Sequence, residues 1–264
     1  MDIDQTASRE TALITGASSG IGLELARLFA ADSYNLVLVA RRNDALLALA
    51  EDLHARRGVG VRVLARDLNR SSAPHDIVEM MLSDGIHVDV LVNNAGFGAR
   101  GAFAELDSQR QLDMIQVNVT ALTLLTRLLL PGMLARNRGG ILNVASTAAF
   151  QPGPFMAVYY ATKAYVQSFT EAIAEEVAGS GLRVTCLSPG PTKTEFAARA
   201  GTEGSKLLRR TSSMSAPDVA RMGYAGWRKG RVLVVPGMTN TFGTWAVRFM
   251  PRRVVRRLIS GLNR

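Results

Sequence analysis

Short apolar runs alternate along the chain with longer stretches of helical period. The short runs are rich in valine, leucine and isoleucine without polar alternation, which is typical of strands buried on both faces of a parallel sheet. Seven runs are predicted strands: residues 11–15, 35–40, 61–65, 88–92, 141–145, 182–188 and 231–235. Helical period is clearest in four stretches between them: residues 23–31, 45–56, 109–135 and 157–178. This order predicts an α/β fold with three layers, a doubly wound parallel sheet between helices.

Composition favours one folded domain. The chain has 264 residues, of which 47% are hydrophobic, and this is enough apolar surface to exclude disorder as the dominant state. Cys186 is the only cysteine, so an intrachain disulfide scaffold is excluded. Because no linker or low-complexity tract interrupts the pattern, residues 1–264 are predicted to form a single domain. Residues 194–216, rich in Ser, Thr, Gly and Arg, are predicted to be an insertion in it.

The positive charge lies near one end of the sequence. The formal net charge is +9, yet residues 1–198 hold 17 basic and 20 acidic side chains. Residues 199–264 hold 14 basic and 2 acidic side chains. The excess therefore belongs to the last quarter of the chain and not to the whole fold.

Residues 241–264 are predicted to form a basic amphipathic extension. If the chain is helical after Pro251, five apolar residues share one face: Val254, Val255, Leu258, Ile259 and Leu262. Four arginines line the other face: Arg252, Arg253, Arg256 and Arg257. The apolar face can pack on the domain or on another subunit. Alternatively, the segment makes peripheral contact with a membrane or steers an anionic substrate. Nucleic acid is not an expected partner, because the tail has no interleaved aromatic residues and no known motif.

The N-terminal residues have neither the basic region nor the apolar region of a signal peptide. No stretch reaches the roughly 18 uninterrupted apolar residues that a membrane span needs. We expect a cytoplasmic protein whose membrane contact, if it has any, is peripheral.

A glycine loop follows the first predicted strand. Its sequence is TGASSGIG, with glycines at positions 16, 20 and 22, and a predicted helix begins directly after it. Such a loop lets the backbone approach a pyrophosphate at a helix N-terminus. The alternative is a plain glycine-rich turn. The candidate cofactor contacts are Gly16, Ser18, Ser19, Gly20, Ile21 and Gly22.

The end of the second predicted strand indicates which nucleotide is bound. An NAD-preferring site usually has an acidic residue there, but this strand is followed by Arg41 and Arg42. Guanidinium groups pair well with a 2′-phosphate, so NADP(H) is predicted in preference to NAD(H). The alternative is two solvated surface arginines.

Tyr159 and Lys163 are four residues apart on a predicted helix and therefore share a face. A nearby ammonium group stabilises a phenolate and lowers the pKa of a tyrosine, which would make Tyr159 a proton donor and acceptor near neutral pH. The alternative is a structural tyrosine beside an exposed lysine. Ser146 follows the fifth predicted strand, at the sheet edge where ligands bind in this architecture.

The glycine loop resembles that of the short-chain dehydrogenase/reductase family, and the resemblance covers about residues 10–240. It is strongest to bacterial general oxidoreductases related to ketoacyl-CoA and 17β-hydroxysteroid reductases, and it implies a Rossmann fold. It identifies Asn118, Ser146, Tyr159 and Lys163 as a catalytic tetrad, in which Asn118 bends its helix and anchors a water. It also implies further cofactor contacts by Asp67, Leu68, Asn94, Ala95, Gly96, Pro189, Gly190 and Thr192, as well as by Tyr159 and Lys163.

The predicted function is reversible hydride transfer between NADP(H) and a carbonyl or alcohol, without a metal. The alternative is a cofactor-binding regulator or scaffold with little turnover. The resemblance places the substrate between residues 148–155 and residues 194–216. Apolar residues there favour a lipid-like or steroid-like ketone: Phe150, Phe155, Met156, Phe196, Leu207 and Leu208. The family also implies a homodimer or homotetramer.

Overall fold

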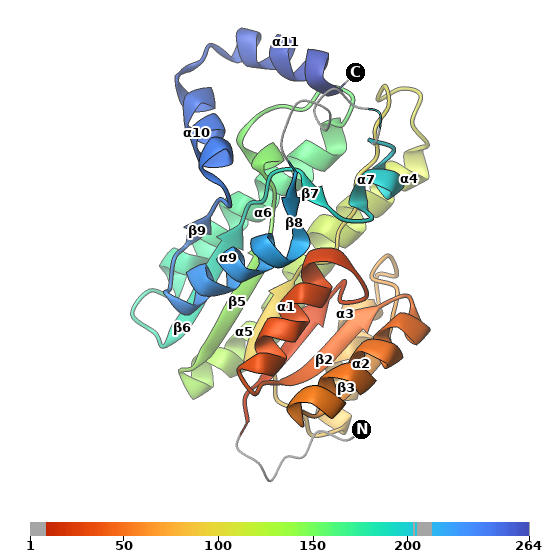
Figure 1. Cartoon of the computed structure of the whole chain (residues 1–264), viewed down its shortest axis with the longest axis vertical. Coiled ribbons are helices and arrows are strands. Elements are labelled where there is room, and N and C mark those ends of the chain that lie inside the picture. The colour runs from red at the N-terminus through yellow and green to blue at the C-terminus, as the bar shows by residue number, and fades with distance from the viewer. Residues whose placement is uncertain (1–8, 203, 205–212, 264) are drawn as a thin grey trace.

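The computed structural model describes residues 9–202, 204 and 213–263 of the chain. Its centre is a seven-stranded sheet of order β3-β2-β1-β4-β5-β6-β9, in which every neighbouring pair is parallel (Figure 1). The strands are β1 (Thr11–Thr15), β2 (Asn35–Ala40), β3 (Val61–Ala65), β4 (Val90–Asn93), β5 (Gly139–Val144), β6 (Leu182–Leu187) and β9 (Leu233–Val234). The predicted doubly wound α/β fold is therefore confirmed.

Helices cover both faces of this sheet and form two separate apolar layers with it. One layer contains Phe29, Leu46 and Trp227, which come from α1 (Gly20–Ala31), α2 (Asn43–Arg57) and α9 (Ala216–Arg228). The other layer is built on α3 (Ala73–Ser83), α5 (Leu122–Arg136) and α6 (Ala157–Glu176). Because both faces are covered, the strands are apolar without alternation.

The predicted helix over residues 109–135 is continuous but contains a wider turn. It comprises α4 (Ser108–Ile115), a π-helical segment η1 (Gln116–Ala121) and α5. Asn118 lies in the π-helical segment, so the expected distortion of the helix at this residue is present. Among the described residues, Ser108–Arg136 is the one helix long and apolar enough to cross a membrane. Its α5 part packs on α3 and on the sheet, and 33% of its most apolar window is buried.

Within the described part of the chain, sequence patterns missed four helices and overestimated one strand. The first turns of α3 and α9 contain Pro74 and Pro217, a signature of helix starts that could have predicted them. The other two are α7 (Phe196–Ala200) and α10 (Met238–Ala246). The last predicted strand spans residues 231–235, but only Leu233–Val234 pairs with β6 in the sheet.

After β9 the chain leaves the sheet and forms what we call the C-terminal cap, residues 238–263. It contains α10, the 3₁₀ turn η3 (Val247–Phe249) and α11 (Arg252–Asn263). These helices lie beyond the end of the sheet where the strands finish (Figure 1). The predicted insertion, residues 194–216, contains α7 (Phe196–Ala200) and β8 (Met214–Ser215), and β7 (Thr192–Lys193) lies directly before it. Leu207 and Leu208, predicted to line the substrate site, lie outside the described residues.

Candidate active site

The glycine loop is packed closely against the turn after β4. Gly16 has a φ of +67° and its N–H donates to the Val39 carbonyl at 2.8 Å. A Cβ at Gly22 would lie 2.3 Å from the Asn94 amide nitrogen and 2.4 Å from the Gly16 oxygen. Only glycine fits such a site without a shift of the backbone. The first turn of α1 is thereby placed where its amide groups can receive a phosphate.

Asn94 and Ala95 hold this loop through Thr15. The Asn94 side-chain amide donates to the Thr15 carbonyl at 2.9 Å and to the Gly16 carbonyl at 3.2 Å. The backbone N–H groups of Asn94 and Ala95 both donate to the Thr15 hydroxyl at 3.0 Å. The predicted cofactor motifs after β1 and β4 therefore form one rigid unit.

Asn118 connects the turn after β4 to helix α6. Its side chain is buried, donates to the Phe97 carbonyl at 2.9 Å and to the Thr162 hydroxyl at 3.0 Å, and accepts from the Phe97 N–H at 3.0 Å. The π-helical turn exposes this amide to both elements. A Cβ at Gly96 would lie 2.9 Å from the Asn118 oxygen and 3.3 Å from the Lys163 nitrogen. Gly96 thus allows Asn118 and Lys163 to approach the cofactor side of the site.

Tyr159 and Lys163 share one face of α6, as predicted, and both are buried. The Lys163 ammonium donates to the Val144 carbonyl at 2.8 Å and lies 5.9 Å from the centre of the Tyr159 ring. The Tyr159 hydroxyl hydrogen bonds with Ser146, whose oxygen also accepts from the Ala148 N–H at 3.1 Å. Three of the four predicted catalytic side chains therefore meet at the ends of β5 and α6.

The electrostatics differ from the expectation that Lys163 lowers the pKa of Tyr159. Burial raises the pKa of Tyr159, and the hydrogen bond from Ser146 opposes this only in part. Burial also lowers the pKa of Lys163 to about 8. Tyr159 is therefore held protonated, the state of a proton donor, beside an ammonium that is still charged at pH 7.

The two arginines after β2 have different surroundings. The Arg42 guanidinium donates to both oxygens of Glu195, at 3.2 and 3.0 Å, and to the Ser18 carbonyl at 3.2 Å. This pairing holds the pKa of the Glu195 carboxyl below its usual range, and Ser19 also hydrogen bonds with that carboxylate. Arg41 is exposed beside it. Glu195, which sequence reasoning missed, is thus the carboxylate that pairs with Arg42 in this structure.

One cavity of about 1170 Å³ joins these groups. Of the predicted site residues, it is lined by Gly16, Ser18, Ser19, Gly20, Ile21, Arg41, Arg42, Asp67, Leu68, Asn94, Ala95, Gly96, Ser146, Tyr159, Lys163, Pro189, Gly190 and Thr192. Gly22 and Asn118 are not among the residues that line it; both support the wall from behind. The glycine turns, the two arginines and the polar residues at the ends of the strands fit a phosphorylated dinucleotide placed along this cavity.

The C-terminal cap closes the other end of the cavity, which sequence reasoning missed. Its apolar residues Val247, Met250 and Ile259 line the cavity and belong to the same apolar cluster as Tyr159. Asn263 is buried and holds α11 in place: its side chain accepts from the Tyr160 hydroxyl at 3.3 Å and donates to the Pro154 carbonyl at 2.9 Å. The Arg100 guanidinium donates to the Asn263 carbonyl at 2.6 Å. Packing of α11 on the domain, one of the predicted alternatives, is therefore present.

Comparisons with known proteins agree with this geometry. A sequence model of the short chain dehydrogenase family matches residues 10–204. A very-long-chain 3-oxoacyl-CoA reductase of Phaeosphaeria nodorum is 39% identical over 182 residues, which are 67% of this chain and 53% of that protein. A sulfoacetaldehyde reductase of Chromohalobacter salexigens is 38% identical over 213 residues, which are 78% of this chain and 83% of that protein.

Two solved structures show the same fold with different cofactors. A short-chain dehydrogenase from Sphingobium yanoikuyae in complex with NADPH is 32% identical with a TM-score of 0.82, over 91% of this chain and 92% of that chain. A short chain dehydrogenase/reductase from Burkholderia phymatum in complex with NAD is 26% identical with a TM-score of 0.80, over 93% of each chain. Overall similarity therefore does not distinguish NADP(H) from NAD(H).

Proposed function

The chain belongs to the short-chain dehydrogenase family, whose members are oxidoreductases acting on CH–OH and C=O groups with a nicotinamide cofactor, and from this premise we propose that it is an NADP(H)-dependent reductase of apolar ketones. The observation that carries the proposal is the convergence of Ser146, Tyr159 and Lys163 on the same cavity as the glycine loop. Asn118 supports this group from behind.

In the proposed reaction the bound cofactor supplies a hydride to the carbonyl carbon. Tyr159 donates the proton that the carbonyl oxygen needs, and the Ser146 hydroxyl stabilises the negative charge that develops on that oxygen. The Lys163 ammonium stabilises the phenolate that forms when Tyr159 gives up its proton. Asn118 keeps Lys163 and Tyr159 aligned by joining α6 to the turn after β4. Reprotonation of Tyr159 completes the cycle.

The preference for NADP(H) rests on Arg41 and Arg42. No carboxylate follows β2 directly in the sequence, and both guanidiniums line the cavity. A 2′-phosphate with its two negative charges competes well for Arg42 with the single charge of Glu195. The proposed adenosine contacts are Asp67, Leu68, Asn94, Ala95 and Gly96, and the proposed nicotinamide contacts are Pro189, Gly190 and Thr192.

An apolar substrate is supported by the lining of the cavity near Tyr159. Phe97, Met156 and Phe196 lie there together with the apolar residues of the C-terminal cap. The Phe196 ring centre is 5.2 Å from that of Tyr159, so a substrate carbonyl at Tyr159 would place its apolar groups among these side chains.

The proposed assembly is a homo-oligomer formed through α5 and α6, and the proposed location is the cytoplasm. The two helices lie side by side, since the Thr123 and Tyr165 hydroxyls are 3.0 Å apart. Half-exposed apolar side chains remain on the outer surface of this helix region, including Leu112, Ile115 and Leu134. A second copy would cover them.

The experiment that tests the function is NADPH oxidation with a panel of ketones and acyl thioesters, for wild type and for Tyr159→Phe. We expect turnover by the wild type and a loss of roughly 10²–10⁴-fold in kcat for the variant, with NADPH binding unchanged. Tyr165→Phe, on the same helix and half-exposed, is the matched control and should keep full activity.

Undiminished turnover by Tyr159→Phe would refute the assigned role of Tyr159. NADPH binding without oxidation across the panel would instead favour the regulator or scaffold.

A further inference from the structure

Helix α10 carries its large apolar side chains on the outside. Met238, Phe242, Trp245 and Phe249 recur at helical spacing, and their exposed fractions are 90%, 75%, 63% and 73%. The residues of the same segment that line the cavity are mostly small or polar, among them Asn240, Gly243 and Thr244, with Val247 as the larger apolar exception. A surface helix of a protein that is surrounded by water has the reverse arrangement. We call Phe242, Trp245 and Phe249 the aromatic row. An exposed row of this kind indicates a site of contact with an apolar partner.

Helix α11, which follows this segment in the chain, carries positive charge. Arg252, Arg253, Arg256 and Arg257 are exposed, and in the described ranges 9–202, 204 and 213–263 no carboxylate pairs with them. No acidic residue follows Asp218 in the sequence, so nothing in the last 46 residues neutralises this charge. Two apolar residues of α11, Val254 and Leu258, are also about half-exposed.

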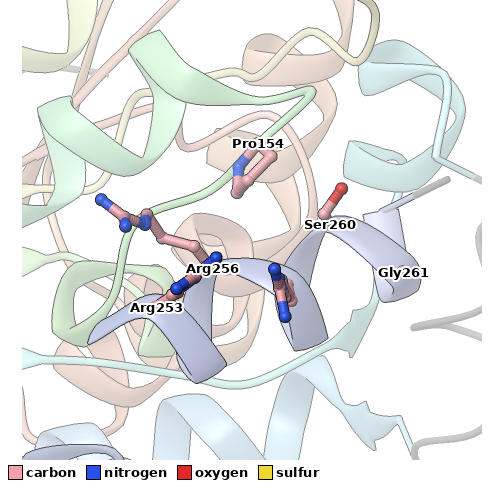
Figure 2. A pocket seen from close by; sticks show the side chains of 6 residues that line it. Pro154, Arg253, Arg256, Ser260 and Gly261 are labelled. Atoms are coloured by element: carbon pink, nitrogen blue, oxygen red, sulfur yellow. The ribbon is translucent and has the colours of Figure 1, made fainter. Parts of the chain in front are cut away.

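Three of these arginines surround an open hollow of about 470 Å³. It is lined by Arg253, Arg256 and Arg257 with Ser260 and Gly261 of α11, and by Pro154 from the facing loop. Figure 2 shows Arg253, Arg256 and Ser260 on the helix and Pro154 opposite them. Guanidinium groups and a hydroxyl around one concave site are the donors that a phosphate group requires.

We propose that the C-terminal cap docks on an anionic lipid bilayer, with Phe242, Trp245 and Phe249 inserted at the interface and lipid phosphates held by the arginines of α11. Aromatic side chains favour the membrane interface, and basic residues favour anionic headgroups. A second copy of the chain fits this surface less well. A symmetric dimer through the C-terminal cap would bring two arginine clusters together, at a cost in repulsion.

Docking would place the cavity next to the bilayer. Leu258 and Met250 line the cavity, and they belong to the same segment that carries the aromatic row and the arginines. If the proposed function holds, an apolar ketone dissolved in the membrane would reach Tyr159 from this side. The docking itself does not depend on which substrate is reduced, so a sedimentation experiment without substrate tests it separately.

The test is sedimentation of the full chain with vesicles of phosphatidylcholine alone or mixed with phosphatidylglycerol, at low and high salt. We expect binding to the anionic vesicles that weakens with salt. The combined change Arg253→Gln, Arg256→Gln and Arg257→Gln should weaken it roughly a hundredfold, since each arginine near an anionic surface contributes about fivefold. The combined change Phe242→Ser, Trp245→Ser and Phe249→Ser should weaken it at least about tenfold.

Matched controls alter similar side chains elsewhere on the surface. Leu82→Ser with Phe103→Ser removes exposed apolar groups, and Arg57→Gln with Arg127→Gln removes exposed charges. Neither control should change vesicle binding, and none of the variants should lose turnover of a water-soluble ketone. Circular dichroism of each variant verifies that it is folded.

Three results would overturn the proposal. The first is that wild type stays in solution with anionic vesicles at low salt. The second is that the controls weaken binding as much as the test variants do. The third is that the aromatic variant keeps its vesicle binding but has a smaller mass by light scattering, because the aromatic row would then be an interface between copies.

Discussion

The two ends of the cavity are built by different means. At the cofactor end, short loops after β1 and β4 are joined by backbone geometry and by hydrogen bonds to Thr15. At the substrate end, the C-terminal cap is held over the cavity by a few side-chain contacts, chiefly those of Asn263. The first end depends on residues that permit only one local arrangement, whereas the second depends on contacts between distant parts of the chain. Substitutions at the cofactor end should therefore have large effects on binding or activity, and substitutions at the substrate end should have smaller ones.

Lys163 provides the largest expected effect, because it lies where the two ends meet. Lys163→Met removes the charge beside Tyr159, and we expect kcat to fall at least about 100-fold. The free energy of unfolding, in contrast, should rise in this variant. Burial lowers the pKa of Lys163 from 10.5 to about 8, so the unfolded chain binds this proton more tightly than the folded protein does. The folded wild type carries this penalty in full below about pH 8 and loses it as the pH rises towards 10.5.

Burying the charged Lys163 destabilises the folded wild type by about 3 kcal/mol, and Lys163→Met removes this cost. The same substitution also removes the hydrogen bond to Val144, which stabilises the wild type by about 1 kcal/mol. Lys163→Met should therefore unfold with a free energy about 2 kcal/mol larger at pH 7, and this advantage should shrink at pH 10. Urea unfolding at both pH values measures it. An advantage that grows with pH would mean that burial does not lower the pKa of Lys163.

Gly22→Ala is the strongest test of the cofactor end. The new Cβ would overlap the Asn94 amide and the Gly16 oxygen, so the glycine loop must shift. Overpacking of this kind costs about 1–3 kcal/mol, and we expect NADPH to bind roughly tenfold more weakly. Isothermal titration with NADPH and thermal unfolding measure the two effects.

Gly132→Ala is the matched control, because Gly132 is also helical and its added Cβ would meet only the flexible end of Arg136. It should keep NADPH binding and gain up to about 1 kcal/mol of stability from helix propensity. Equal losses in both variants would show that the glycine loop is not specially constrained.

The same contrast, between local motifs and contacts of distant residues, explains which parts of the site can be predicted from the sequence. Tyr159 and Lys163 are one helical turn apart, and the glycines that shape the loop directly follow a strand, so local periodicity and turn chemistry predict both. Asn263 and Glu195 contact Tyr160 and Arg42 across 103 and 153 residues. No local pattern carries such a pairing. The pattern likewise predicts one apolar face over residues 254–262, but of these residues only Val255 and Ile259 are buried, whereas Val254 and Leu258 are about half-exposed.

Asn263→Ala tests the substrate end. It removes the hydrogen bonds to Tyr160 and Pro154 and leaves the buried Tyr160 hydroxyl without this partner, which costs about 1–3 kcal/mol. Because the C-terminal cap then opens more readily, we expect KM for an apolar ketone to rise about three- to tenfold, with NADPH affinity unchanged. Gly261→Ala, exposed on the same helix with open space around it, should leave KM as it is. A loss of NADPH affinity in Asn263→Ala would show that the two ends are coupled.

The smallest effect is expected at Glu195, where the substrate side meets the cofactor side. Its carboxylate pairs with Arg42 at the surface, and exposed ion pairs contribute about 0–1 kcal/mol. In the proposed NADP(H) site a 2′-phosphate takes the place of this carboxylate on Arg42, so Glu195→Gln should tighten NADPH binding about two- to fivefold. NADH, which has no 2′-phosphate, should gain less.

Glu176→Gln, an exposed carboxylate far along α6, changes the net charge equally and should leave the ratio of the two affinities unchanged. If NADPH instead binds more weakly to Glu195→Gln, then Glu195 orients Arg42 for the phosphate, and the boundary between the two ends is itself part of the cofactor site.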